Sequence, residues 1–143
     1  MALEAVKSKN FARTDIGEFA KLGHDADSDK NAKQFLRDVL GLTGMEISVT
    51  HYGPGTKTPF FHSHKQNEEL YIVVKGSGQM QLDDELFELK EGTFVRVLPQ
   101  ASRCIKADAN SELVFLCIQA KDGSLEQCNR ADGVRENTSE LWK

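Results

Sequence analysis

The sequence predicts an all-β protein folded as an antiparallel barrel or sandwich. Short segments rich in β-branched and aromatic residues follow one another closely from residue 45 onward, and turns containing Gly or Asp separate them. No segment after Gly44 has the length and apolar periodicity of a convincing helix. The chain has 143 residues, the size of one ordinary domain, so we expect these strands to share one core.

The composition is that of a globular chain and disfavours two classes of partner. Hydrophobic residues make up 39% of the chain and charged residues 28%, and the formal net charge of −4 argues against nucleic acid and anionic membranes. Neither a signal-peptide core nor an apolar run of membrane-spanning length is present, so we expect a cytoplasmic location. Cys104, Cys117 and Cys128 are widely spaced and odd in number, which predicts free thiols rather than disulfides.

Residues 1–44 are predominantly polar, and we expect them to form an extension that packs on the barrel. Short strands are predicted at 6–10 and 16–19, followed by a charged loop at 23–30. Residues 31–40 fit either a helical face or a strand, because so short a run satisfies both periodicities. Gly41 and Gly44 end this segment in either case.

Residues 45–121 contain the regular strand pattern. The segment 45–52 alternates apolar and polar residues with the period of a half-buried strand, and a Gly-Pro-Gly turn follows it. Further strands are predicted at 69–75, 79–82, 86–89, 93–98, 102–107 and 113–118, with a Gly-containing connection at 76–78 and an acidic turn at 83–85. Residues 122–143 are expected to form an arm with a loose strand at 124–128, whose terminal Leu141 and Trp142 dock on a surface.

The densest group of metal-ligand side chains lies between residues 58 and 76. His62 and His64 are two residues apart, so in an extended chain both imidazoles point to the same side. After a short polar turn, Glu69 opens the apolar strand. Two neutral imidazoles and one carboxylate are the ligands of many zinc and non-haem iron sites. The spacing therefore predicts a site for one divalent ion, with positions left open for water or substrate.

These residues resemble the first motif of the cupin superfamily, which runs from a glycine through His-x-His and a glutamate to a second glycine. The matching positions are Gly55, His62, His64, Glu69 and Gly76, with one extra residue between Gly55 and His62. The resemblance implies a single jelly-roll β-barrel over residues 45–121, with extra edge strands and with the metal ligands pointing into its interior. Because this fold hosts dioxygenases, isomerases, decarboxylases, storage proteins and sugar sensors, the resemblance does not specify an activity.

The second cupin motif, which supplies a fourth histidine ligand, departs from the family pattern. Six residues rather than five separate Gly92 from Pro99. Counting from Gly92 places the ligand position on Arg103, whereas counting from Pro99 places it on Cys104, and the motif's later asparagine position slightly favours Cys104. A Cys104 thiolate would be a soft fourth ligand. Arg103 would repel a divalent ion, and would instead pair with Glu69 or hold an anionic substrate.

Two functions follow from these alternatives. The first is a metal-binding cupin in which His62, His64 and Glu69, with Cys104 as candidate fourth ligand, hold one ion of Fe, Mn, Ni or Zn, in a small-molecule dioxygenase or isomerase. The second is a metal-free barrel that binds or senses a sugar or organic acid through Arg103. Further candidate residues for contacting the small molecule are Tyr71, Phe60 and His51. The resemblance also implies pairing of two copies into a homodimer.

Overall fold

The computed structural model describes residues 3–22 and 31–143, and it confirms the all-β class. The helical elements of the described ranges are a 3-10 turn, η1 (Phe19–Lys21), and the single-turn helix α1 (Arg37–Leu40). No helix in these ranges is long and apolar enough to cross a membrane. The charged loop predicted at residues 23–30 lies outside the described residues.

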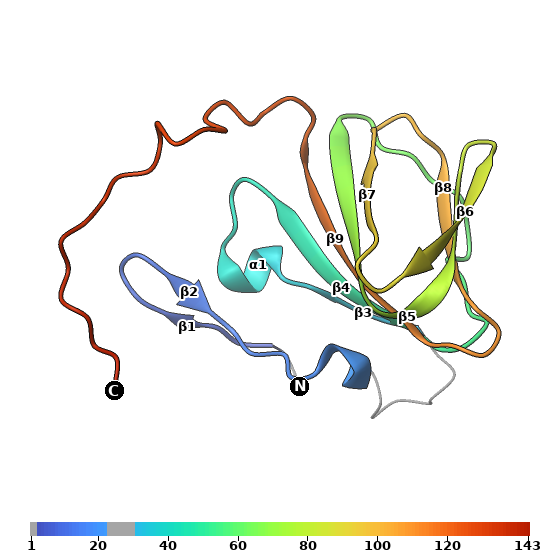
Figure 1. The fold of residues 1–143 in the computed structure, drawn as a ribbon, viewed down its shortest axis with the longest axis horizontal. Coiled ribbons are helices and arrows are strands. Elements are labelled where there is room, and N and C mark those ends of the chain that lie inside the picture. Colours follow the sequence, from blue (N-terminus) through green and yellow to red (C-terminus); the bar gives the residue numbers. More distant parts are fainter. Residues whose placement is uncertain (1–2, 23–30) are drawn as a thin grey trace.

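Antiparallel strands build the rest of the fold (Figure 1). The strands in chain order are β1 (Val6–Lys7), β2 (Ala12–Arg13), β3 (Ala32–Phe35), β4 (Glu46–Tyr52), β5 (Asn67–Leu82), β6 (Glu85–Lys90), β7 (Phe94–Val97), β8 (Arg103–Ala107) and β9 (Leu113–Lys121). The first half of β5 pairs with β7 and β9, and its second half pairs with β6 and β8. β4 pairs with β9 and β3, so β5 joins one layer made of β3, β4 and β9 to another made of β6 and β8.

The strand β5 changes layers at a glycine-containing bulge. Its register against β9 shifts between Val73 and Lys75, and the next residue, Gly76, has a φ of 79°. A Cβ atom at Gly76 would collide with the backbone carbonyl of Glu112, so only glycine fits there. The expectation of a connection at 76–78 between two strands is therefore corrected. These residues lie inside one continuous strand of 16 residues, which bends instead of ending.

One hydrophobic core lies between the two layers. Its largest members come from both layers and are Tyr52, Tyr71, Val73, Met80, Leu89, Val97, Ile105, Leu113 and Phe115. The hydrogen-bonded pairing among the described strands ends at β3 and β6 and does not run around the whole barrel. The structure thus shows two antiparallel layers around a shared core, as expected for a jelly roll. The hydrogen-bonded pairing of the described strands does not close into a full barrel.

The N-terminal extension contains less strand than predicted. β1 and β2 form a two-residue pairing, and the segment expected as a strand at 16–19 has no strand pairing and leads into η1. The ambiguous residues 31–40 form both elements in succession. β3 pairs with β4, with Ala32 opposite His51, and α1 follows and ends at Gly41, whose φ is 68°.

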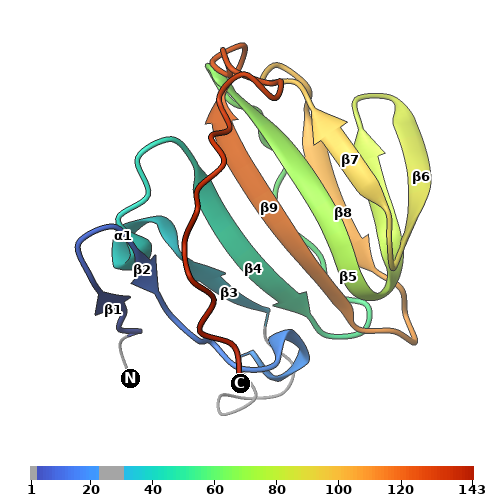
Figure 2. The same ribbon diagram turned by 60° about the vertical axis from the view of Figure 1, so that its left-hand side comes forward.

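The C-terminal residues 122–143 form no strand, so the strand expected at 124–128 is absent. They follow β9 as an irregular, exposed coil, which Figure 2 shows in red. Leu141 and Trp142 keep 89% and 85% of their surface exposed, so no described part of this chain covers them. Their docking on another molecule stays a prediction.

Candidate metal centre

The two histidines lie on the connection between β4 and β5, which runs beside β8. His62 and Arg103 form an isolated antiparallel bridge, in which the amide of each donates to the carbonyl oxygen of the other at 3.3 and 3.1 Å. The amide of His64 donates to the carbonyl of Pro99 at 2.7 Å. These hydrogen bonds fix the chain on both histidines, and their ring centroids lie 5.3 Å apart. The expected convergence of the two imidazoles is therefore present.

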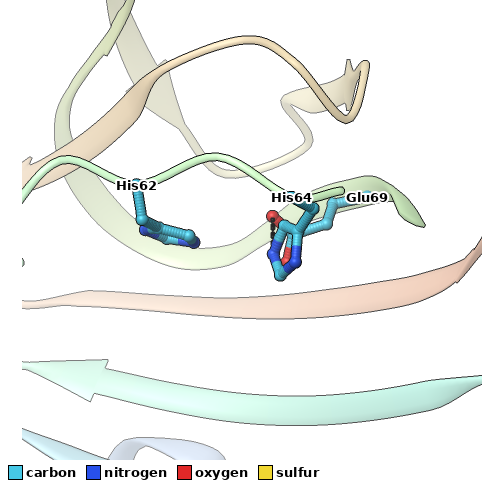
Figure 3. A group of neighbouring side chains, drawn as sticks. All are labelled: His62, His64 and Glu69. Carbon is cyan, nitrogen blue, oxygen red and sulfur yellow. Dashed lines mark ion pairs between the residues drawn. The ribbon is translucent and has the colours of Figure 1, made fainter. Parts of the chain in front are cut away.

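Glu69 of β5 completes a group of three that we call the ligand trio (Figure 3). One ligand atom from each of His62, His64 and Glu69 lies within 4.8 Å of the other two. His62 Nδ1 and His64 Nε2 are buried, and neither has a hydrogen-bond partner among the described residues, although His64 Nε2 lies 3.3 Å from Glu69 Oε1. Burial lowers the pKa of His62, which favours the neutral imidazole that binds metals.

Two protonated side chains hold the Glu69 carboxylate in place. The Tyr71 hydroxyl donates to Oε1 at 2.9 Å, and the Cys117 thiol donates to Oε2 at 2.9 Å. Burial, reinforced by nearby negative charge, raises the pKa of both groups well above their ordinary values, so both remain donors at neutral pH. Tyr71 was expected to contact a small molecule, whereas Cys117 was expected only to be a free thiol. Its contact with Glu69 depends on the β5–β9 register, which places Tyr71 opposite Cys117.

The structure places Arg103, not Cys104, beside the ligand trio. Arg103 is 1% exposed, its Nε lies 3.5 Å from Glu69 Oε1, and its Nη2 donates to the carbonyl of Leu98 at 2.9 Å. Cys104 has the opposite strand parity, its thiol donates to the carbonyl of Thr58 at 3.3 Å, and it is not part of the group of ligand atoms. This placement agrees with the register counted from Gly92 and disagrees with the slight preference for Cys104.

A small cavity of about 60 Å³ opens beside the trio. It is lined by Lys33, Thr50, Tyr52, Thr58, His62, Glu69, Tyr71, Arg103, Cys104, Ile105, Phe115 and Cys117. A buried water needs on the order of 10–15 Å³ of such space, so the cavity has room for only a few waters or a ligand of a few non-hydrogen atoms.

Two residues predicted to contact a small molecule do not line this cavity. Phe60 is 63% exposed, although its ring centroid lies 6.0 Å from that of His62. His51 lies on the other face of β4 from Thr50 and Tyr52, where its ring nitrogens contact the Leu22 carbonyl at 3.1 Å and Glu112 Oε2 at 3.0 Å. His51 therefore contacts Leu22 and Glu112 on the other face of β4 and does not line the cavity.

The fold and the ligand trio define a β-barrel protein with a candidate metal centre in its interior. Residues 48–119 match the Cupin_2 family, described as the cupin domain. The match covers half of the chain, and the chain therefore belongs to the cupin family.

Solved and curated proteins are similar to this chain. A crystal structure of a cupin protein from Bacteroides fragilis is 39% identical with a TM-score of 0.77, covering 90% of this chain and 99% of that one. A "Putative sugar phosphate isomerase" from Acidithiobacillus ferrooxidans is 26% identical with a TM-score of 0.57, covering 66% of this chain and 61% of that one. Uncharacterized protein MJ1618 of Methanocaldococcus jannaschii is 38% identical over 63 residues, which are 44% of this chain and 50% of that protein. The match thus spans about half the length of this curated relative.

Proposed function

We propose that this cupin binds one divalent metal ion through His62, His64 and Glu69. The observation that carries the proposal is the convergence of two buried imidazole nitrogens, without hydrogen-bond partners in the described part of the chain, on a buried carboxylate. Two imidazoles and one carboxylate suit Fe, Mn, Ni or Zn and leave coordination positions open. The open positions and the adjoining cavity support a small molecule as the partner of the ion.

The chain's own residues would prepare the site for this ion. Tyr71 and Cys117 fix the Glu69 carboxylate from two sides, and the bridge to Arg103 fixes the backbone of His62. The bound ion would supply a Lewis acid to an oxygen atom of the ligand. Similarity to the Acidithiobacillus protein supports isomerase chemistry over dioxygenase chemistry, although the cavity favours a molecule smaller than a sugar phosphate.

Metal analysis of protein purified without an affinity tag tests the proposal. The wild-type protein, incubated with Fe²⁺, Mn²⁺, Ni²⁺ or Zn²⁺ and desalted, should retain close to one equivalent of one of them, and the double variant His62→Ala/His64→Ala should retain almost none. His51→Gln is the matched control, because it removes a histidine from the other face of β4 and should keep the metal. The proposal fails if the wild-type and double-variant proteins carry equally little metal.

The alternative, a metal-free binding barrel, is favoured by one observation. Arg103 lies at the position of the missing fourth ligand and forms an ion pair with Glu69, so a permanent cation already partly neutralises the carboxylate. If no divalent ion binds while a small organic acid does, this alternative replaces the metal proposal.

We also expect a cytoplasmic homodimer. The exposed Leu141 and Trp142 at the end of the C-terminal arm support association with a second copy. Light scattering of the full chain should give the mass of a dimer, and a monomeric mass at high protein concentration would contradict the expectation.

A further inference from the structure

We infer that the cavity beside the ligand trio is a binding site for a small carboxylate, held by the guanidinium group of Arg103. The inference deepens the proposed function, because it names the class of molecule that shares the cavity with the ion. It rests on that function only for the ion's presence, since Arg103 would hold the carboxylate with or without a metal.

The hydrogen bonding of the Arg103 guanidinium group is incomplete among the described residues. A guanidinium group has five N–H donors, and only Nη2 has an acceptor, the carbonyl of Leu98. Nε and Nη1 are buried and have no hydrogen-bond partner among the described residues, although Nε forms the 3.5 Å ion pair with Glu69. Buried charged donors are costly to leave without acceptors. Because Arg103 also lines the cavity, a ligand oxygen there would supply one.

The charged residues that line the cavity favour an anionic ligand. Arg103 and Glu69 line the cavity as a buried ion pair, and Lys33, which also lines it, is an exposed cation whose ammonium lies 4.7 Å from the Phe35 ring centroid. The lining residues therefore include one more cationic than anionic side chain, in a chain whose formal net charge is −4. A divalent ion on the trio would increase this excess, which favours an anion over a neutral sugar.

The size of the cavity and the shape of the guanidinium group suit a small carboxylate. A cavity of about 60 Å³ admits a ligand of only a few non-hydrogen atoms. The planar guanidinium fork matches the two oxygens of a carboxylate, and the hydroxyl-bearing Thr50 and Thr58 line the same space. A monocarboxylate of one to three carbon atoms supplies acceptor oxygens for Arg103, carries a negative charge and is small enough for the cavity.

Calorimetric titration of the untagged full chain with acetate tests the inference, with chloride used to keep the ionic strength constant. Acetamide has nearly the same shape without the charge, and citrate carries carboxylates on a molecule too large for the cavity. We expect saturable binding of acetate to the chelator-treated and the metal-loaded protein, and binding of acetamide and citrate at least about tenfold weaker.

Two variants and a control locate the site. Arg103→Gln should weaken acetate binding about tenfold or more, and Arg103→Lys, which keeps the charge but loses the planar fork, should weaken it less. Arg96→Gln should leave it unchanged, because Arg96 is exposed and pairs with Glu68 and Asp122 instead. Circular dichroism checks that each variant is folded. If Arg103→Gln is unfolded, a crystal of the wild-type protein soaked in acetate must show the carboxylate next to Arg103.

The outcomes separate this inference from the proposed metal site. Metal retention without acetate binding overturns the inference and leaves the metal proposal intact. Acetate binding without metal retention supports the inference and overturns the metal proposal. The inference is also overturned if acetamide binds as tightly as acetate, if folded Arg103→Gln keeps the wild-type affinity, or if the soaked acetate lies elsewhere.

Discussion

Arg103 Nε lies 3.5 Å from Glu69 Oε1, and both side chains are almost completely buried. The pair joins a candidate metal ligand to a permanent cation at the position where the cupin pattern has a fourth histidine. Arg103 therefore has two opposing effects. It compensates the buried charge of Glu69 in the free protein, and it repels a divalent ion that approaches the same carboxylate.

Replacing Arg103 with glutamine should strengthen binding of Zn²⁺ by about tenfold or more, because a cation next to the site is removed. Arg103→His should strengthen it further, because it restores a fourth ligand. Without metal, Arg103→Gln should lose about 3 kcal/mol of stability, since Glu69 remains buried without its cation, and bound Zn²⁺ should restore much of this loss.

Competition against a chromogenic chelator measures these affinities, and thermal unfolding with and without Zn²⁺ measures the rescue. The control is again Arg96→Gln, whose guanidinium pairs with Glu68 on the protein surface. An Arg103→Gln variant that binds Zn²⁺ no more tightly than the wild-type protein would show that the repulsion has no effect on the site.

Tyr71→Phe should weaken metal binding by about tenfold to a hundredfold, because the hydroxyl that orients Glu69 at 2.9 Å is lost. We expect a loss of stability of about 1 kcal/mol. Tyr52→Phe is a closely matched control. Tyr52 is also buried and lines the same cavity, but its hydroxyl contacts Thr58 at 2.8 Å and not the ligand trio. Equal losses of metal affinity in both variants would contradict a specific role for Tyr71.

The ligand trio could be predicted from the sequence because its spacing rules are local. Two histidines separated by one residue face the same side of an extended chain, and the spacing of the motif selects Glu69. The contact of Cys117 with Glu69 joins residues 48 positions apart and depends on the pairing of β5 with β9. Whether Arg103 or Cys104 takes the fourth-ligand position depends on the one extra residue between Gly92 and Pro99. A shift of one residue along a strand turns each side chain to the opposite face, so this spacing alone does not decide which of the two points toward the ligand trio.

The orientation of β4 is a second feature that could not be predicted from the sequence. Alternation of apolar and polar residues predicts a half-buried strand with the apolar side inward, and His51 lies on that side. In the structure both faces are buried over residues 48–52, and Thr50 and Tyr52 line the polar cavity, while Val49 lies on the opposite face near Phe19. The N-terminal extension covers the outer face, which the periodicity of β4 alone does not reveal.

Gly76→Ala should destabilise the protein by at least about 3 kcal/mol. Its φ of 79° disfavours any residue with a Cβ, and the added methyl group would collide with the Glu112 carbonyl at the bend of β5. Gly44→Ala is the control, because a Cβ there meets no atom of the described chain within 4 Å, and its effect should stay within about 1 kcal/mol. Urea denaturation measures both. Similar midpoints for the two variants would show that β5 tolerates a side chain at its bend.

The Glu112 carboxylate contacts Lys75 Nζ at 3.0 Å and His51 Nε2 at 3.0 Å. The hydrogen bond from Lys75, assisted by the one from His51, lowers the pKa of Glu112 below its ordinary value of 4.5, although partial burial opposes this. A carboxyl whose pKa is lowered on folding contributes stability above its unfolded pKa and loses this contribution as the pH falls through its folded pKa. The contribution of Glu112 is therefore complete near pH 7 and decreases below about pH 4.5.

Glu112→Gln should accordingly lower the free energy of unfolding at pH 7 by up to about 1 kcal/mol, the range of partly exposed ion pairs. The difference from the wild-type protein should shrink as the pH is lowered from 4.5 to 3, because protonation removes the same charge from wild-type Glu112. Glu91→Gln, at an exposed turn after β6, should show no such convergence. Urea unfolding at several pH values measures the difference, and a value that is the same at pH 3 as at pH 7 would exclude a contribution from the Glu112 charge.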